Sequence, residues 1–148
     1  MIKVVAENIN IMSKYTGNAM REKDPKPIQE WAAKLTERGA DLLDLNLGPA
    51  RKGGAEMMQW LVKTVQEATD LPLFLDTTNN DAVEAGLQVY VPKSGPAVIN
   101  SIMATPERMA LQLPLVNKYG CEMVGLMWGP QGIPRDENER AVLLDSMM

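Results

Sequence analysis

Three segments of the sequence end an apolar run on a carboxylate or an amide, side chains suited to binding a polar ligand. The runs are Leu42-Leu43-Asp44-Leu45-Asn46, Leu71-Pro72-Leu73-Phe74-Leu75-Asp76 and Ala97-Val98-Ile99-Asn100. Such runs are typical of buried parallel strands, and ligands bind at the carboxyl ends of these strands in α/β folds. Carboxylates accept hydrogen bonds, and amides both donate and accept them. The pattern therefore predicts a polar binding site at one end of a sheet.

The types of residue that are missing limit the chemistry of this site. The 148 residues include no histidine and one cysteine, Cys121, which we expect to be a small core residue. A zinc site would need an unusual all-carboxylate ligand set, and Ser–His or Cys–His nucleophilic catalysis is excluded within this chain. We therefore expect no metal site. Any chemistry must depend on carboxylates, amides, hydroxyls, backbone groups or a bound cofactor.

The composition is that of a globular protein without an electrostatic footprint for nucleic acid. The hydrophobic content is 45%, charged residues make up 23%, and the net charge is −4. The first fifteen residues lack the apolar segment of a signal peptide, and no run reaches the roughly 18 apolar residues that span a membrane. A single cysteine favours a reducing compartment. We expect a cytoplasmic protein that binds neither nucleic acid nor membrane.

The predicted elements alternate along the chain, with strands at 2–6, 42–46, 72–76, 97–100 and 123–127. A glycine-containing loop is expected after the first strand. Helix starts are expected at Asp24-Pro25, Asn79-Asn80, Thr105-Pro106 and Asp136. The last helix is expected to place Ala141, Leu144 and Met148 on one face. This alternation favours a parallel sheet with right-handed crossovers.

Two architectures fit this order of elements: an open doubly wound sheet, or the first part of a (β/α)8 barrel. No Gly-x-Gly-x-x-Gly fingerprint follows the first strand, and no Walker-type loop is present. A complete barrel needs about 250 residues, so this chain would supply about the first five β/α units. The apolar inner faces of strands such as 73–75 would then be exposed.

Five short motifs at the ends of the predicted strands resemble those of the methyltetrahydrofolate:corrinoid protein methyltransferases. They are Glu7-Asn8-Ile9-Asn10, Asp44-Leu45-Asn46-Leu47-Gly48-Pro49, Leu75-Asp76-Thr77-Thr78-Asn79, Ile99-Asn100-Ser101 and Gly132-Ile133-Pro134. That family belongs to the pterin-binding superfamily, together with dihydropteroate synthase and the folate domain of cobalamin-dependent methionine synthase. The resemblance covers the whole chain, and its motifs occur in the same order. Asn8 stands where an arginine is often found.

The resemblance implies a TIM-type (β/α)8 barrel, usually a homodimer, in which residues 1–148 form the N-terminal part of the pterin-binding domain. It assigns substrate binding to Glu7, Asn10, Asp76, Asn100 and Ser101, and catalysis to Asp44 and Asn46. The family also uses an Asp and an Asn from later strands, which lie beyond Met148. We therefore expect residues 1–148 alone to be an incomplete, inactive part of the barrel.

The resemblance also implies the reaction, which moves a methyl group between N5 of methyltetrahydrofolate and the cobalt of a corrinoid held by a partner protein. Because the cofactor supplies the nucleophile, the enzyme needs no nucleophilic side chain. Its own tasks are to orient the pterin and to assist N5 as a leaving group by hydrogen bonding or protonation.

Other interpretations of the same residues remain open. A dihydropteroate synthase would carry an Asn-x-Thr-x-Asp-Ser-Phe loop and a Ser-Thr-Arg loop, which are not found here. An inactive barrel fragment or an interaction module is the alternative from another class. At the residue level, Asp76 would be an ordinary helix cap, Asn100 a turn residue, and Asp44 and Asn46 a structural hydrogen-bond network. Trp128 would contact the corrinoid partner or pack in the core.

Overall fold

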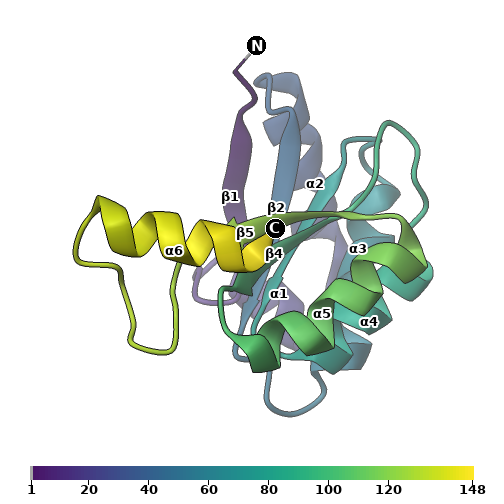
Figure 1. The fold of residues 1–148 in the computed structure, drawn as a ribbon. Helices are drawn as coiled ribbons and strands as arrows, with labels where there is room; N and C mark the ends of the chain where they lie inside the picture. The colour runs from purple at the N-terminus through teal and green to yellow at the C-terminus, as the bar shows by residue number, and fades with distance from the viewer. Residues whose placement is uncertain (1) are drawn as a thin grey trace.

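The computed structural model describes residues 2–148, in which strands and helices alternate along the chain (Figure 1). The strands are β1 (Val5–Asn10), β2 (Leu42–Gly48), β3 (Leu73–Thr77), β4 (Val98–Met103) and β5 (Glu122–Leu126). The helices are α1 (Thr16–Glu22), α2 (Pro25–Glu37), α3 (Gly54–Gln66), α4 (Asn80–Val89), α5 (Pro106–Tyr119) and α6 (Glu137–Met147).

The strands form one parallel sheet in the order β1-β2-β3-β4-β5, which confirms the predicted topology. Sequential parallel strands joined by helices are consistent with part of a TIM-type barrel. In Figure 1, α3, α4 and α5 lie beside one another on one side of the sheet. Helix α6 lies in front of the sheet, apart from those three.

The two faces of the central strands have opposite character because side chains alternate along a strand. Leu43, Leu45, Leu73, Leu75 and Ile99 are fully buried in the main core. Their alternate neighbours Asp44, Asn46, Asp76 and Asn100 occupy the other face. The prediction of exposed apolar faces at 73–75 is therefore wrong for Leu73 and Leu75, while Phe74, on the face of Asp76, is half-buried. Leu75 packs toward α3 and α4. A methyl group added at Gly86 of α4 would lie 3.0 Å from Leu75 Cδ1 and 2.7 Å from Met58 Cγ of α3.

The helix starts expected from cap residues are confirmed. The side chains of Asp24, Asn79, Thr105 and Asp136 each accept hydrogen bonds from backbone N–H groups in the first turn of the helix that follows. These bonds satisfy donors that have no partner inside the helix. At the other end of α5, Gly120 adopts the left-handed conformation with φ 60°, as expected for a helix stop.

The beginning of the chain differs from the prediction in two ways. The first strand begins at Val5 rather than at residue 2, because Val4 turns to bond Asp41 through its N–H at 2.8 Å. The motif at Glu7–Asn10 thus lies within β1. The expected loop after it contains α1, whose Gly17 approaches so closely that an added Cβ would lie 2.1 Å from the Ile11 carbonyl oxygen. Only glycine permits this contact.

Helix α6 also differs from its predicted orientation. It has no buried residue, and Leu144 and Met148 of the expected apolar face are 50% and 91% exposed. The contacts with the strand and loop before it come instead from Leu143 and Met147, which lie against Gly129 and Gly125. In the described part of the chain, no helix is both long enough and apolar enough to cross a membrane.

Candidate active site

Polar side chains from three neighbouring strands lie at one level near the carboxyl end of the sheet. Asn46 of β2 pairs in register with Asp76 of β3, and Asp76 pairs with Asn100 of β4. Neighbouring strands are about 4.8 Å apart, and residues in register point to the same face. The structure therefore brings Asp76 and Asn100 together, well within the span of one small-ligand site.

The Asn46 side chain links Asp76 to the loop that follows β2. Its Oδ1 accepts a hydrogen bond from the Gly48 N–H at 2.9 Å, and its Nδ2 donates to Asp76 Oδ2. Because Oδ1 is occupied by a backbone donor, the amide must turn its N–H groups toward Asp76. Asp76 Oδ1 accepts no hydrogen bond from any residue between 2 and 148 and is left for a ligand.

Asp44 lies on β2 two residues before Asn46, on the same face of the sheet, and is only 1% exposed. Its Oδ1 accepts a hydrogen bond from Asn100 Nδ2 at 3.0 Å. Burial raises the pKa of Asp44 to about 7, and the negative charges of Asp76 and Glu7 add to the rise, while the Asn100 hydrogen bond opposes it. A carboxyl group that titrates near neutral pH can hold or release a proton under physiological conditions.

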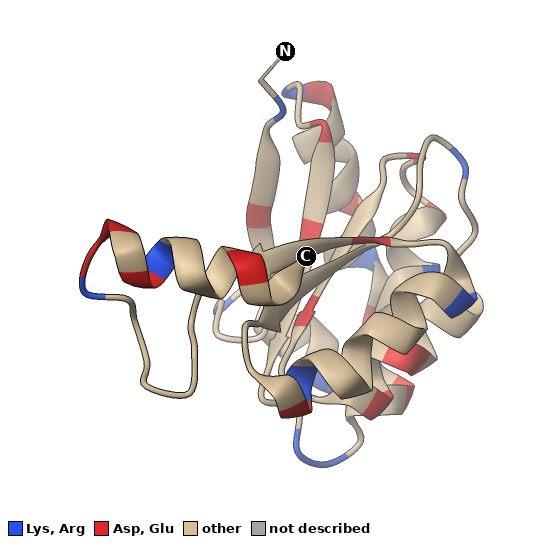
Figure 2. Ribbon diagram, viewed as in Figure 1, with Lys and Arg blue, Asp and Glu red and all other residues tan. Residues whose placement is uncertain are grey.

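The carboxyl group of Asp76 is half-buried and shares this environment. Burial raises its pKa above the usual range, the Asn46 hydrogen bond lowers it, and the charge of Glu7 raises it. The residues of β1 to β5 include four acidic side chains and no lysine or arginine. In Figure 2 the lysine and arginine positions, coloured blue, lie on helices and loops instead. The site therefore concentrates negative charge without a balancing cation on the strands.

The other three predicted site residues have different surroundings. Glu7 is exposed on β1 and influences Asp44 and Asp76 through its charge. Asn10 pairs in register with Asn46, but its Oδ1 accepts from the Met12 N–H at 2.8 Å and so shapes the loop after β1. Ser101 is half-buried, and its hydroxyl forms no hydrogen bond with other residues of the described chain.

Sequence reasoning missed the contacts by which two residues, Thr77 and Asn79, hold the loops of this site in place. Thr77, 3% exposed, donates from Oγ1 to the Gly48 carbonyl at 2.6 Å. Asn79 donates from Nδ2 to the Ala50 carbonyl at 2.7 Å while its Oδ1 caps α4. Both bonds tie the β2–α3 loop to the end of β3. The polar run Thr77-Thr78-Asn79 directly after an apolar strand was the available signal.

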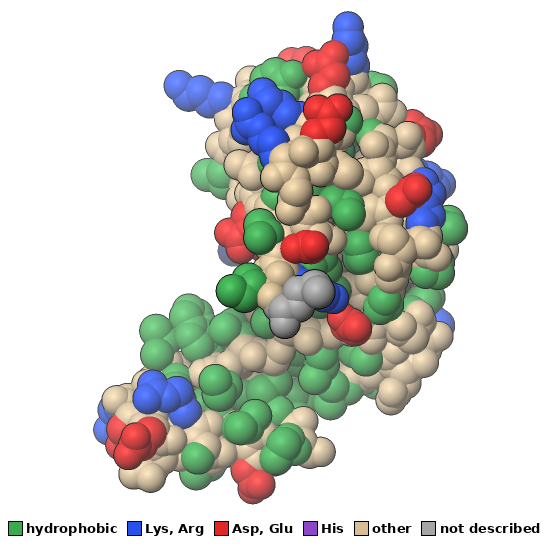
Figure 3. All heavy atoms as spheres, turned by 90° about the horizontal axis from the view of Figure 1, so that it is seen from above, with side chains coloured by type: hydrophobic (Ala, Val, Ile, Leu, Met, Phe, Trp, Pro, Cys, Tyr) green, Lys and Arg blue, Asp and Glu red, His purple; other side chains and the backbone are tan. Residues whose placement is uncertain are grey.

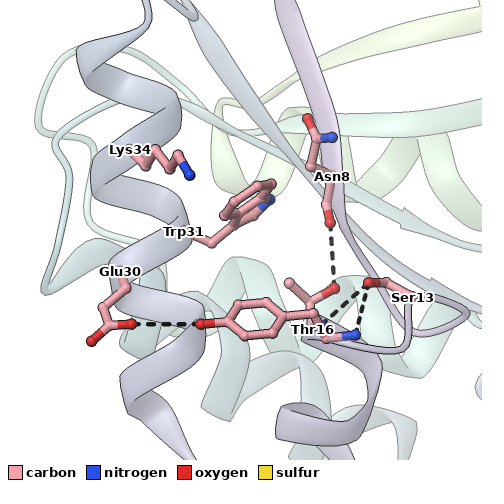
Figure 4. Close-up of a pocket in the computed structure, with 7 residues that line it drawn as sticks. Asn8, Ser13, Thr16, Glu30, Trp31 and Lys34 are labelled. Carbon is pink, nitrogen blue, oxygen red and sulfur yellow. Dashed lines mark hydrogen bonds between the residues drawn. The ribbon is translucent and has the colours of Figure 1, made fainter.

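A hollow of about 430 Å³ lies between β1 and α2 (Figure 4). It is lined by Asn8, Ser13, Tyr15, Thr16, Glu30, Trp31 and Lys34. The Tyr15 ring packs edge-on against Trp31 with centroids 6.1 Å apart, and the Lys34 ammonium lies 4.9 Å from the Trp31 ring centroid. The four residues Asp44, Asn46, Asp76 and Asn100 form an acidic network at the ends of the strands. The hollow contains none of them, so it is a separate feature of the surface.

The acidic network has a definite chemical character. It presents carboxylate and amide oxygens, which suit a planar ligand with neighbouring N–H groups. Within residues 2–148, no group of three or more His, Cys, Asp or Glu side chains is arranged to hold a metal ion. The fold and the network together define an α/β protein with a candidate ligand site at the carboxyl ends of parallel strands.

Comparison with known families narrows this class. Residues 8–146 match the family described as pterin binding enzyme. The match covers nearly all of the chain and includes each strand that contributes to the network. The chain belongs to the pterin-binding enzyme family.

Individual relatives agree with this membership. Over 147 residues the chain is 29% identical to a methylcorrinoid:tetrahydrofolate methyltransferase of Eubacterium limosum, covering 98% of this chain and 53% of that protein. It is 28% identical to the methionine synthases of Mycobacterium tuberculosis and Mycobacterium leprae, covering 99% and 92% of this chain but 13% and 11% of those proteins. The chain thus spans about half the length of the first relative and a small part of the others.

Proposed function

We propose that this chain forms the pterin-binding part of a methyltransferase that moves a methyl group between N5 of methyltetrahydrofolate and a corrinoid held by a partner protein. The observation that carries the proposal is the network in which Asn46, Asp76 and Asn100 share one level of the sheet, with Asp44 bonded behind them. The similarity to the Eubacterium limosum methyltransferase supports the same reaction class.

The network complements the aminopyrimidine edge of a pterin. That edge carries an amino group beside a ring N–H, and a carboxylate accepts hydrogen bonds from two such donors at once. Asp76, with a free oxygen on the polar face, is placed to accept them. Asn100, on the neighbouring strand, supplies an amide at the same level. No lysine or arginine lies on the strands, so no cation there competes with the ligand for these acceptors.

The residues of the chain would bind and orient the pterin rather than attack it. The corrinoid cobalt would supply the nucleophile or the methyl group, so the absence of histidine is compatible with the reaction. Holding the pterin ring in one orientation accounts for much of the barrier reduction expected in such a transfer. In this proposal Glu7, Asn10 and Ser101 belong to the binding site, and Asp44 and Asn46 belong to the catalytic network.

The first test of the proposal is pterin binding by the native polypeptide that carries this sequence. We expect Asp76→Ala to weaken methyltetrahydrofolate binding by about 2 to 4 kcal/mol, because ligand donors lose a charged partner. Asn100→Ala removes a neutral partner and should cost roughly 1 to 3 kcal/mol. Isothermal titration calorimetry measures both. Glu122→Ala is the matched control, since this acidic residue lies at the first position of β5, at the opposite end of the sheet.

The second test concerns the reaction itself. Spectroscopic detection of corrinoid methylation should show activity in the native polypeptide, and a parallel assay for pteroate formation should show none. Pteroate formation without corrinoid methylation would contradict the proposal in favour of a dihydropteroate synthase. The proposal also includes a homodimer in the cytoplasm, as the family resemblance implies, and sedimentation of the native polypeptide tests the dimer.

A further inference from the structure

The loops around the acidic network carry positive charges that the strands lack. Arg51 and Lys52 lie in the loop between β2 and α3, and Arg108 lies in the first turn of α5, which follows β4. In Figure 2, blue positions occur on that loop and at the start of α5. Each of these segments follows the carboxyl end of its strand, where the network also lies. The three basic residues are called the cationic rim below.

Hydrogen bonds place Arg108 beside the chain that leaves β3. Its Nη1 and Nη2 each donate to the Thr78 carbonyl at 3.0 Å, and Nη1 also donates to Asn80 Oδ1 at 3.3 Å. Thr78 is two residues after Asp76, which is a chain length of at most about 7 Å. The guanidinium of Arg108 is therefore fixed close to the acidic network.

The loop that carries Arg51 and Lys52 is tied to the same stretch of chain. Asn79 Nδ2 donates to the carbonyl of Ala50, the residue before Arg51, at 2.7 Å. Asn79 is three residues after Asp76, a chain length of at most about 11 Å. Both parts of the cationic rim thus meet residues 78–80, next to the end of the strand that carries Asp76.

The cationic rim has charge and donors available for an anion. None of its three side chains forms an ion pair with a carboxylate in residues 2–148. Arg51 and Lys52 are exposed, and their side chains donate no hydrogen bond to that part of the chain. A guanidinium has five N–H donors. Arg108 uses at most three of them in the contacts with Thr78 and Asn80.

We propose that Arg51, Lys52 and Arg108 form a subsite for the carboxylates of a folate's glutamate tail. The inference deepens the proposed pterin function and depends on it. A folate joins its pterin, through an aminobenzoyl group, to a glutamate with two carboxylates. The carboxylates of the acidic network repel this tail, whereas the cationic rim attracts it. The separation of charge therefore orients the ligand, with the aminopyrimidine edge toward the strands and the tail toward the rim.

The experiment compares two probes, 5-methyltetrahydrofolate and 5,6-dimethyltetrahydropterin, which share the methylated pterin ring. Only the first probe has a glutamate tail. Dissociation constants are measured by isothermal titration calorimetry in the native polypeptide that carries this sequence. The double variant Arg51→Gln with Lys52→Gln should weaken binding of 5-methyltetrahydrofolate about three- to tenfold, because each exposed charge pair contributes modestly. The affinity for the tailless probe should change by less than about twofold.

The matched control is the double variant Arg38→Gln with Lys63→Gln. It removes the same charge from two exposed side chains at the C-terminal ends of α2 and α3, at the opposite end of the sheet. The affinity for each probe should stay within about twofold of the wild type, because salt screens charges at that distance. An equal effect of the two double variants on 5-methyltetrahydrofolate would overturn the inference in favour of a general effect of net charge.

Salt provides a test in the wild type that depends on no variant. Raising the ionic strength from about 0.01 M to about 0.5 M screens exposed charges. The preference of the wild type for the probe with the tail should therefore fall toward the preference of the Arg51→Gln, Lys52→Gln variant. The preference of that variant should change less with salt. A wild-type preference that does not depend on salt contradicts the inference.

Arg108→Gln tests the third member of the cationic rim, whose guanidinium also holds Thr78. It should lower the preference for the probe with the tail, and circular dichroism establishes that the variant folds. An equal loss of affinity for both probes would show that Arg108 only positions the loop, and would remove it from the subsite.

Two further outcomes separate this inference from the proposed function. Unchanged binding of both probes in Arg51→Gln with Lys52→Gln, together with a raised KM for the corrinoid protein, would overturn the inference and assign these cations to the partner surface. A wild type that binds neither probe contradicts the proposed pterin function itself. A wild type that binds both probes with equal affinity retains the pterin site and contradicts only the tail subsite.

Discussion

The ends of β2, β3 and β4 contrast with the β5–α6 region, although each consists of strand, loop and helix. In the first region, α3 and α4 each pack one helix face into the core. Leu45 and Leu75, on the face of the sheet opposite the polar residues, are fully buried. In the second region, α6 buries no residue. Figure 3 shows α6 and its preceding loop as an arm set apart from the body by a hollow, with hydrophobic side chains along it.

This difference shows what the acidic network requires. Asn46 and Asn100 keep one amide orientation because the backbone that carries them is packed against two helices. The arm is held mainly by local contacts, such as the hydrogen bond of Arg135 N–H with Glu139 at 2.7 Å and the packing of Leu143 on Gly129. Polar groups can be placed within a few tenths of an ångström only where the layer behind them is close-packed.

The largest predicted effect tests the difference in packing by removing the same apolar volume from each region. Leu45→Ala removes a fully buried side chain between Asp44 and Asn46 and should lower the free energy of unfolding by about 3 kcal/mol. Leu144→Ala, at a residue of α6 that is 50% exposed, should change it by less than about 0.5 kcal/mol. Urea denaturation followed by circular dichroism measures both. Equal losses would show that α6 is packed as firmly as the sheet.

A smaller effect of opposite sign, an increase in the free energy of unfolding, is expected from a substitution in the acidic network. The pKa of Asp44 is raised in the folded state to about 7, from 3.8, so its contribution to stability is complete below pH 4 and is lost as the pH rises through 7. Asp44→Asn removes this loss, because the amide carries no charge. At pH 8 the variant should be more stable than the wild type by on the order of 2 kcal/mol.

The pH dependence provides the check on this prediction. Denaturation curves at pH 5, 6.5 and 8 should show stability falling in the wild type and much flatter behaviour in Asp44→Asn. A variant that is less stable than the wild type at pH 8 would mean that the ionised Asp44 stabilises the fold. In that case burial would not be the main influence on its pKa.

The smallest predicted effect compares alanine substitutions at two glycines, one in each region. Gly86→Ala places a methyl group 2.7 Å from Met58 Cγ in the packed layer and should destabilise the protein by about 1 to 2 kcal/mol, even though alanine favours helix. Gly129→Ala places one 2.6 Å from Leu143 Cδ2, but the loosely held α6 can shift, so the expected change is within about 0.5 kcal/mol. Thermal unfolding of both variants tests whether α6 shifts to accommodate the added methyl group. A larger loss for Gly129→Ala than for Gly86→Ala would contradict the looser packing of α6.

The sequence was most informative where local pattern and tertiary structure agree. The alternating order of strands and helices, the caps at Asp24, Asn79 and Thr105, and the placement of Asp44, Asp76 and Asn100 at one end of the sheet followed from apolar runs and cap chemistry. These features depend on residues close together in the chain. The binding and catalytic roles of the predicted site residues all stay predictions: Glu7, Asn10, Asp44, Asn46, Asp76, Asn100 and Ser101.

Features that depend on distant contacts could not be predicted in the same way. The start of β1 was misplaced because Val4 bonds Asp41, a residue far along the chain, instead of continuing the strand. Helix α1 was missed because its start depends on the contact of Gly17 with Ile11. The directions of the Asn46 and Asn100 amides depend on partners across the sheet, which no local pattern specifies. The prediction of which face of α6 is buried failed because this helix makes few contacts with the rest of the chain.

The register of the strands has a consequence for how long this protein survives in its surroundings. Asn46, Asp76 and Asn100 meet only while β2, β3 and β4 are paired, and a slip by one residue would send any one of them to the opposite face. Under the proposed function, a pterin bound to Asp76 and Asn100 binds only the paired state. At one hundred times its dissociation constant it would add about 2.7 kcal/mol to the free energy of unfolding. Under the proposed function, the supply of pterin would then set the protein's resistance to proteolysis.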